Sequence, residues 1–262
     1  MEYQNLVKSN PPPFVQTYVN VGNGSTVVLL NGLFGNLSMW QPLVEHLKKD
    51  FRVIVPRLPI FDLPIQHNSM KHLTKVLHEF IEWNQLTSVT LVGHAVGGQL
   101  ALFYAHHHPD KIDKLILTGS SGLIDHALID NTLEQKEINY DFVSKKVQLA
   151  FYDRPEEATK LAQEIYLNVR NIPQRLAISS FVRSSLRSSV SSFLSQLTMP
   201  IKLIWGLQDT VTPPEVALHF HDLLLHAEVK FIDRCGHFPM MEQTDEFNNA
   251  VSGFLKGRKV SK

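Results

Sequence analysis

The stretch Gly93-His94-Ala95-Val96-Gly97 decides the fold of this chain. It follows a largely apolar run, Val89 to Val92, which predicts a buried strand. It leads directly into a segment of helical character, Gly97 to Tyr104. The glycines two positions before and after Ala95 would let the strand and the helix pass close together. The stretch therefore predicts a strand, a sharp turn and a helix, with Ala95 presented above the edge of a sheet.

A turn with this spacing is typical of a nucleophile elbow, in which Gly-x-Ser-x-Gly presents a serine hydroxyl from a strained backbone. Alanine occupies the central position here, so the turn presents a methyl group where a hydroxyl is expected. The identity of residue 95 therefore decides what chemistry the turn can support.

The composition predicts an ordinary globular protein without a nucleic-acid or membrane partner. The chain has 262 residues, with 25 basic and 25 acidic side chains, so no basic field would attract nucleic acid or an anionic membrane. No apolar stretch approaches the roughly 20 residues that span a bilayer, and the N-terminus lacks the apolar core of a secretory signal. With Cys235 as the single cysteine, no internal disulfide can form, and we expect a cytoplasmic protein.

Strand and helix patterns alternate along the first half of the chain and again near its end, which predicts a parallel sheet covered on both faces. Val15 to Val21 and the turn Gly22 to Gly24 indicate an edge hairpin. Ser69 is a plausible N-cap for the helix that follows it. The further strands are expected at 26–30, 51–55, 89–92, 114–117, 201–205 and 229–232, and the helices at 40–47, 70–83, 96–107 and 239–255.

The alternation stops after Gly122, and only helical patterns follow until about Leu197. Helices are expected at 142–151, 158–169 and 176–197. We therefore expect a core of residues 1–121 and 198–262, interrupted by a helical cap of residues 122–197. A further helix is expected to open at Thr212-Pro213-Pro214-Glu215, which has the spacing of a capping box.

Four landmarks in order along the chain resemble the α/β-hydrolase superfamily, specifically its cap-bearing serine hydrolases. They are Asn31-Gly32-Leu33-Phe34-Gly35 after an early strand, the turn at Ala95, Trp205-Gly206-Leu207-Gln208-Asp209 after a later strand, and Cys235-Gly236-His237 after the last one. The resemblance spans nearly the whole chain and implies an α/β-hydrolase fold. Members of this superfamily place nucleophile, acid and histidine in this order along the chain.

The resemblance implies a role for each landmark. His237 would be the general base and Asp209 the carboxylate that orients it, with residue 95 at the nucleophile position. The backbone N–H groups of Val96 and Leu33 would form an oxyanion hole, and Phe34 is the alternative to Leu33. No cofactor and no metal is needed for this chemistry.

Alanine at position 95 leaves three interpretations open. The serine of a hydrolase was replaced deliberately, or the chain is a natural binding protein on a hydrolase scaffold. In the third, His237 and Asp209 act directly as a general base without a serine. The substrate expected from the resemblance is a small molecule, in the range of carboxylesterases, carbon–carbon bond hydrolases and proline iminopeptidases.

Other candidate residues are weaker. His106, His107 and His108 are adjacent on a helix and would diverge, which makes them a poor metal site. Cys235 is expected to be a half-buried structural residue. Asp62 and Asp125 are possible pocket residues without support from their spacing.

Overall fold

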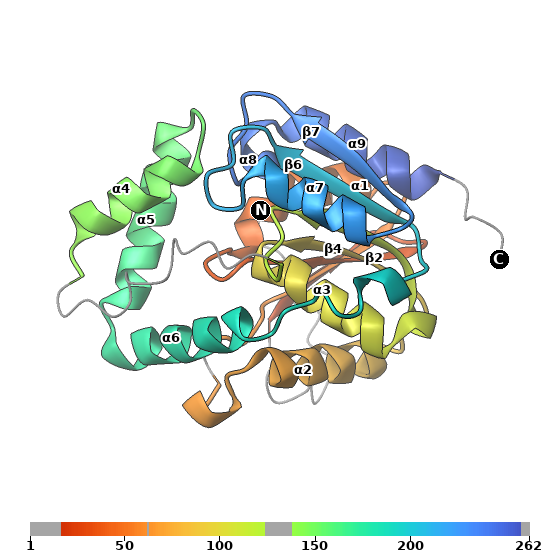
Figure 1. The fold of residues 1–262 in the computed structure, drawn as a ribbon, viewed down its shortest axis with the longest axis horizontal. Helices are drawn as coiled ribbons and strands as arrows, with labels where there is room; N and C mark the ends of the chain where they lie inside the picture. The colour runs from red at the N-terminus through yellow and green to blue at the C-terminus, as the bar shows by residue number, and fades with distance from the viewer. Residues whose placement is uncertain (1–16, 62, 124–137, 258–262) are drawn as a thin grey trace.

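The computed structural model describes residues 17–61, 63–123 and 138–257. Its centre is a seven-stranded sheet in the order β1-β3-β2-β4-β5-β6-β7 (Figure 1). Only β1 runs antiparallel to its neighbour, and the other pairs are parallel. The strands are β1 (Tyr18–Val21), β2 (Thr26–Leu30), β3 (Arg52–Pro56), β4 (Val89–His94), β5 (Ile112–Thr118), β6 (Ile201–Gly206) and β7 (Ala227–Ile232).

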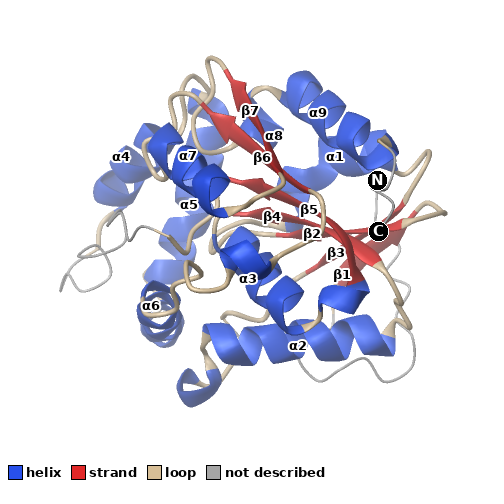
Figure 2. Ribbon diagram, turned by 45° about the vertical axis from the view of Figure 1, so that its right-hand side comes forward, coloured by secondary structure: helices blue, strands red, loops and turns tan. Residues whose placement is uncertain are grey.

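Helices cover both faces of the sheet, as Figure 2 shows. One face packs against α1 (Gln41–Leu47), α8 (Pro239–Glu242) and α9 (Thr244–Lys256), with Trp40 and Phe247 in the core between them. The other face packs against α2 (Met70–Trp83), α3 (Val96–His107) and α7 (Pro214–Leu223). Every residue of β4 is buried, because a central strand of a doubly covered parallel sheet meets apolar side chains on both sides.

Several predicted elements are confirmed. The helix at 70–83 has the predicted bounds, and the Ser69 side chain accepts a hydrogen bond from the His72 amide at 3.2 Å. The helix after the turn at Ala95 runs over Val96–His107. The predicted final helix is divided in two, because α8 ends at Glu242 and α9 starts at Thr244.

The predicted edge hairpin is wrong. β1 does lie at an edge of the sheet, but it pairs with β3 and not with β2, which follows it in sequence. The turn between β1 and β2 packs against the start of β3: a Cβ at Gly22 would lie 2.2 Å from the carbonyl oxygen of Phe51. This close approach carries the chain across β3, so that β2 joins the sheet on the far side.

Between β5 and β6, residues 138–197 contain no strand but three α-helices and a 3-10 turn: α4 (Tyr140–Ala150), α5 (Pro155–Val169), α6 (Ile172–Leu186) and η4 (Leu194–Gln196). In both ribbon views α4 and α5 lie beyond one end of the sheet (Figures 1 and 2). These elements support the proposed division into core and cap, whose boundaries stay a prediction. In the described ranges, no helix has the length and apolar character needed to cross a bilayer.

The helix expected at 176–197 is wrong over its second half, since α6 ends at Leu186. The Gln99 side chain from α3 donates to the carbonyl oxygens of Ser185 at 3.0 Å and Ser188 at 2.7 Å. These bonds satisfy carbonyl groups at the end of the helix. The Val190 amide then donates to the Gly122 carbonyl at 3.0 Å. The Val190 side chain is buried although the residue lies outside any helix.

Candidate active site

Ala95 lies between β4 and α3 with φ 51° and ψ −119°. A non-glycine residue in such a region costs roughly 1–3 kcal/mol, and the surrounding structure must impose it. Here the Ala95 amide donates to the Thr118 carbonyl at 3.1 Å, and the Ala95 carbonyl accepts from the amides of Gly98 and Ser121. The predicted sharp turn is therefore present, and neighbouring β5 holds it in its strained conformation.

Three glycines make room for this turn. A Cβ at Gly93 would lie 2.5 Å from the Gly97 carbonyl oxygen, and one at Gly97 would lie 2.3 Å from the Leu30 carbonyl oxygen. A Cβ at Gly98 would lie 2.4 Å from the Ser120 hydroxyl. The first two contacts are with backbone atoms that cannot move aside. The glycine spacing in the sequence thus reflects close passage of backbone segments, as expected.

Asp209 and His237 form a buried pair. His237 Nδ1 lies 2.8 Å from Asp209 Oδ2, and the two side chains are 6% and 1% exposed. An ionised carboxylate can only accept, so Nδ1 carries the proton and Nε2 is left as the basic nitrogen. The sequence predicted this pair from two landmarks 28 positions apart.

Thr212 holds the Asp209 carboxylate, a role that the sequence did not suggest. Its hydroxyl donates to Oδ2 at 2.9 Å and its amide to Oδ1 at 2.9 Å, and the Val211 amide donates to Oδ1 at 2.8 Å. The predicted capping box is therefore wrong. The helix α7 starts at Pro214 without a side-chain cap, because the threonine hydroxyl is engaged by the aspartate.

A second buried carboxylate, Glu242, holds the loop that carries His237. Its Oε1 accepts from the amides of Gly236 at 3.0 Å and Phe238 at 3.1 Å, and its Oε2 accepts from the Tyr152 amide at 2.7 Å. Burial raises the pKa of Glu242, and these three amide donors oppose that rise. Because Tyr152 follows α4, the same carboxylate connects the histidine loop to the end of that helix.

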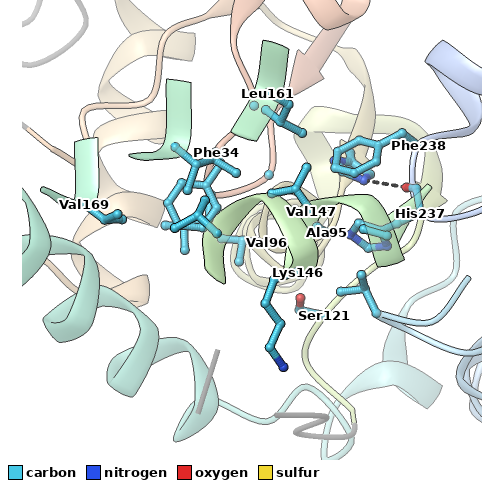
Figure 3. Close-up of a pocket in the computed structure, with 18 of the residues that line it drawn as sticks. Phe34, Ala95, Val96, Ser121, Lys146, Val147, Leu161, Val169, His237 and Phe238 are labelled. Carbon is cyan, nitrogen blue, oxygen red and sulfur yellow. Dashed lines mark hydrogen bonds between the residues drawn. The ribbon is translucent and has the colours of Figure 1, made fainter. Parts of the chain in front are cut away.

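His94, the residue before Ala95, also contacts this loop. Its Nε2 lies 2.9 Å from the His237 carbonyl oxygen, a hydrogen bond that Figure 3 shows as a dashed line. Burial holds the pKa of His94 well below its ordinary value, with a further lowering from the nearby His237. His94 is thus neutral and donates from Nε2, which connects the turn at Ala95 to the loop of the base.

The proposed oxyanion hole is compatible with the backbone geometry. Leu33, Phe34 and Val96 all line the same cavity as Ala95 and His237. Within the described ranges, the amides of Leu33, Phe34 and Val96 donate to no other group. The loop before Leu33 turns back through a bond from the Gly35 amide to the Gly32 carbonyl at 3.1 Å. Both candidates for the first donor, Leu33 and Phe34, therefore remain.

The cavity has a volume of about 180 Å³ and lies between the sheet and the helices α4 and α5. Figure 3 shows Ala95 and His237 on one side of it, with Leu161, Val147 and Val169 from the cap helices around it. Most of its lining is aliphatic or aromatic, and the polar side chains are few: His94, Ser121, Lys146 and His237. Such a pocket suits a small, largely apolar molecule.

Comparison with known proteins places the chain in a family. Residues 25–244 match the family model described as alpha/beta hydrolase fold. The chain belongs to this family. The predicted resemblance and the predicted fold class are confirmed, and the relatives named below are hydrolase enzymes.

The relatives act on different substrates. A monoacylglycerol lipase of Homo sapiens is 24% identical, over 89% of this chain and 76% of that protein. A 2-hydroxy-6-oxo-6-phenylhexa-2,4-dienoate hydrolase of Comamonas testosteroni is 23% identical, over 94% and 92%. Among solved structures, an alpha/beta hydrolase enzyme from the metagenome of lagoon sediments at Mar Chica, Morocco, is 28% identical with a TM-score of 0.75, over 91% and 94%.

The weaker candidates are absent from the described lining of the cavity or lie outside the described residues. Asp62 and Asp125 are not among the described residues. Cys235 is fully buried rather than half-buried, and burial raises its pKa, so it is a poor nucleophile. In the described part of the chain, no group of three His, Cys, Asp or Glu side chains is placed to hold a metal ion.

The three consecutive histidines have separate partners. His106 stacks on Phe193, the His107 ring contacts the Phe103 carbonyl, and His108 stacks on His78.

The sequence did not reveal the roles of Thr212, Glu242 and His94 at this site. The only local signal was their position within or beside the landmark motifs, and that position does not reveal a hydrogen-bond partner.

Proposed function

We propose that this chain carries the machinery of a small-molecule acyl hydrolase, with Asp209, His237 and position 95 as the triad. The observation that supports this most is the buried His237–Asp209 pair at a cavity that the strained Ala95 also lines. Strain at a residue that presents only a methyl group has no use in packing. It does have a use in presenting a nucleophile toward the base.

With serine at position 95, His237 Nε2 would take the hydroxyl proton as the oxygen attacks the acyl carbon. Asp209 would stabilise the imidazolium that results. The amides of Val96 and of Leu33 or Phe34 would donate to the developing oxyanion. With alanine there is no oxygen to attack, so this chain forms no acyl-enzyme and binds its ligand without cleaving it.

The substrates named for the relatives indicate which types of bond this machinery could cleave. The human relative is named for an acylglycerol ester and the Comamonas relative for cleavage of a dienoate. Both are small molecules with an apolar part, and the aliphatic lining of the cavity here suits such a part. We therefore propose an ester or a related acyl bond as the target of the machinery.

The decisive test is Ala95→Ser, assayed on p-nitrophenyl esters of short acids. We expect hydrolysis to rise by several orders of magnitude over the unchanged chain, since disrupting a related triad costs up to about 10⁶ in rate. In parallel, a fluorophosphonate should add one adduct to Ala95→Ser, seen by intact mass, and none to the unchanged chain.

Two other results would select the alternatives. If Ala95→Ser stays inactive on a broad ester panel while the unchanged chain binds a small ligand tightly, the chain is a binding protein. If the unchanged chain turns over a substrate and His237→Ala abolishes that activity, His237 and Asp209 act on water or substrate without a serine. A stoichiometric adduct on the unchanged chain would point to another nucleophile, with Ser121 the first to examine.

A further inference from the structure

Among the described residues that line the cavity, Lys146 is the only lysine or arginine, and the wall around it is mostly apolar. It lies on α4, one turn from Val143 and next to Val147, both of which also line the cavity. Its Nζ is 6.0 Å from the centroid of the Phe142 ring. None of the described residues that line this cavity is an aspartate or a glutamate.

Lys146 differs from the other half-buried lysines of the described ranges. Each of those pairs with a carboxylate at 2.6–2.9 Å, whereas no carboxylate of the described residues pairs with Lys146. The paired lysines are Lys48, Lys111, Lys202 and Lys230. Lys114, which is buried, donates to three carbonyl oxygens.

Lys146 thus lines an apolar cavity, and its ammonium group, which Figure 3 shows leading away from Ala95, has no carboxylate partner among the described residues. This combination affects which ligands can bind. A neutral apolar ligand that fills the cavity removes water from the ammonium group and supplies nothing in return, which is unfavourable. A ligand whose carboxylate lies next to the Lys146 ammonium group replaces the lost water with a charge-assisted hydrogen bond.

We propose that Lys146 binds a carboxylate of the substrate, distinct from the bond that is cleaved, so that the pocket selects amphiphilic anions. This inference rests on the proposed function, which puts the scissile bond next to Ala95. The apolar part of the ligand lies against the aliphatic residues of α4 and α5, and the carboxylate lies toward Lys146.

Binding to the unchanged chain tests this without any need for catalysis. The probes are the monoethyl esters of succinic, adipic and suberic acids, each compared with its neutral diethyl ester by calorimetry. For at least one length, we expect the anionic half-ester to bind about tenfold more tightly than the diester, the gain typical of a hydrogen bond to a charged group. The preference should weaken as salt is added, because Lys146 is only partly buried.

Lys146→Met should abolish the preference, and Lys146→Arg should retain it in part. Lys145→Met is the matched control: it removes the same charge from the neighbouring, exposed position, which does not line the cavity. It should leave the preference unchanged. Equal binding of half-esters and diesters at every length, no binding of either, or equal losses in Lys146→Met and Lys145→Met would overturn the proposal.

The same substitutions in an Ala95→Ser background separate this inference from the proposed function. The ratio of kcat/KM for half-ester over diester should fall about tenfold with Lys146→Met. If Ala95→Ser hydrolyses both esters but the ratio does not change, the carboxylate site is refuted and the hydrolase proposal stands. If it hydrolyses neither while the binding preference persists, the hydrolase proposal fails and the carboxylate site stands.

Discussion

The two walls of the cavity differ in how their polar groups are held. On the sheet side, the Asp209 carboxylate accepts four hydrogen bonds, one of them from His237. The Glu242 carboxylate accepts three, two from the loop that carries His237 and one from Tyr152 after α4. On the cap side, the wall is aliphatic and Lys146 has no carboxylate partner in the described residues. Hydrogen bonds have directional requirements that apolar contacts lack. The difference indicates that the sheet side fixes the chemistry and the cap side selects the ligand.

The largest effect should come from the base. In the Ala95→Ser background, His237→Ala should remove most of the gained activity, by about 10⁴-fold or more, because triad members act as a unit. His219→Ala, at an exposed position on α7, is the control. Steady-state kinetics on p-nitrophenyl butyrate measures both. Retained activity in His237→Ala would mean that the sheet side does not supply the base.

Gly119→Ala should displace the base without removing it. A Cβ at Gly119 would lie 2.8 Å from His237 Cε1, and Gly119 already has φ +53°. A displacement of about 1 Å can cost roughly 10² in rate, so kcat should fall by that order in the Ala95→Ser background. Gly253→Ala is the matched control, since a Cβ there meets nothing within 4 Å. An unchanged kcat in Gly119→Ala would show that the ring position is not critical.

On the cap side, Leu161→Ala should change selectivity rather than chemistry. Removing the Leu161 side chain should change the ratio of kcat/KM for esters of longer acids to that for acetate esters by roughly tenfold, because one or two methylene contacts contribute about 1–3 kcal/mol. The kcat/KM for acetate esters itself should change little. Leu167→Ala, on the same helix but 59% exposed, is the control. A uniform loss across all lengths would contradict the division between the two walls.

The smallest effect is a pH dependence of stability from Glu242. Because its pKa is raised above the ordinary 4.5 in the folded chain, folding favours its protonated form. Its contribution to stability is therefore complete below about pH 4.5 and declines as the pH rises through the raised value. Urea unfolding from pH 4 to 8 should show the stability difference between the unchanged chain and Glu242→Gln shrinking as pH rises.

The control for that experiment is Glu246→Gln, which removes an exposed carboxylate from α9. Its stability difference should show no such decline over this range. A difference between the unchanged chain and Glu242→Gln that stays constant from pH 4 to 8 would contradict the raised pKa.

The sequence predicted the sheet elements and the contact of Asp209 with His237, since both depend on local signals. The strand before Ala95, the turn and the helix are all encoded within residues 89–107, and Asp209 and His237 each follow a recognisable strand. It failed where a remote partner decided the outcome. The Gln99 side chain on α3 bonds to carbonyl groups where α6 ends, and β3 lies between β1 and β2, where a hairpin was expected.

The sequence by itself determined the α/β order of elements, the strained turn at Ala95 and the order of the candidate triad, because periodicity, glycine spacing and strand ends are local properties of the chain. Only the tertiary structure decided that Thr212 holds Asp209, that Glu242 connects the His237 loop to the chain after α4, and that Lys146 lines a mostly apolar cavity. These features join residues from separate elements, and hydrogen bonds and burial between such residues exist only once the chain has packed.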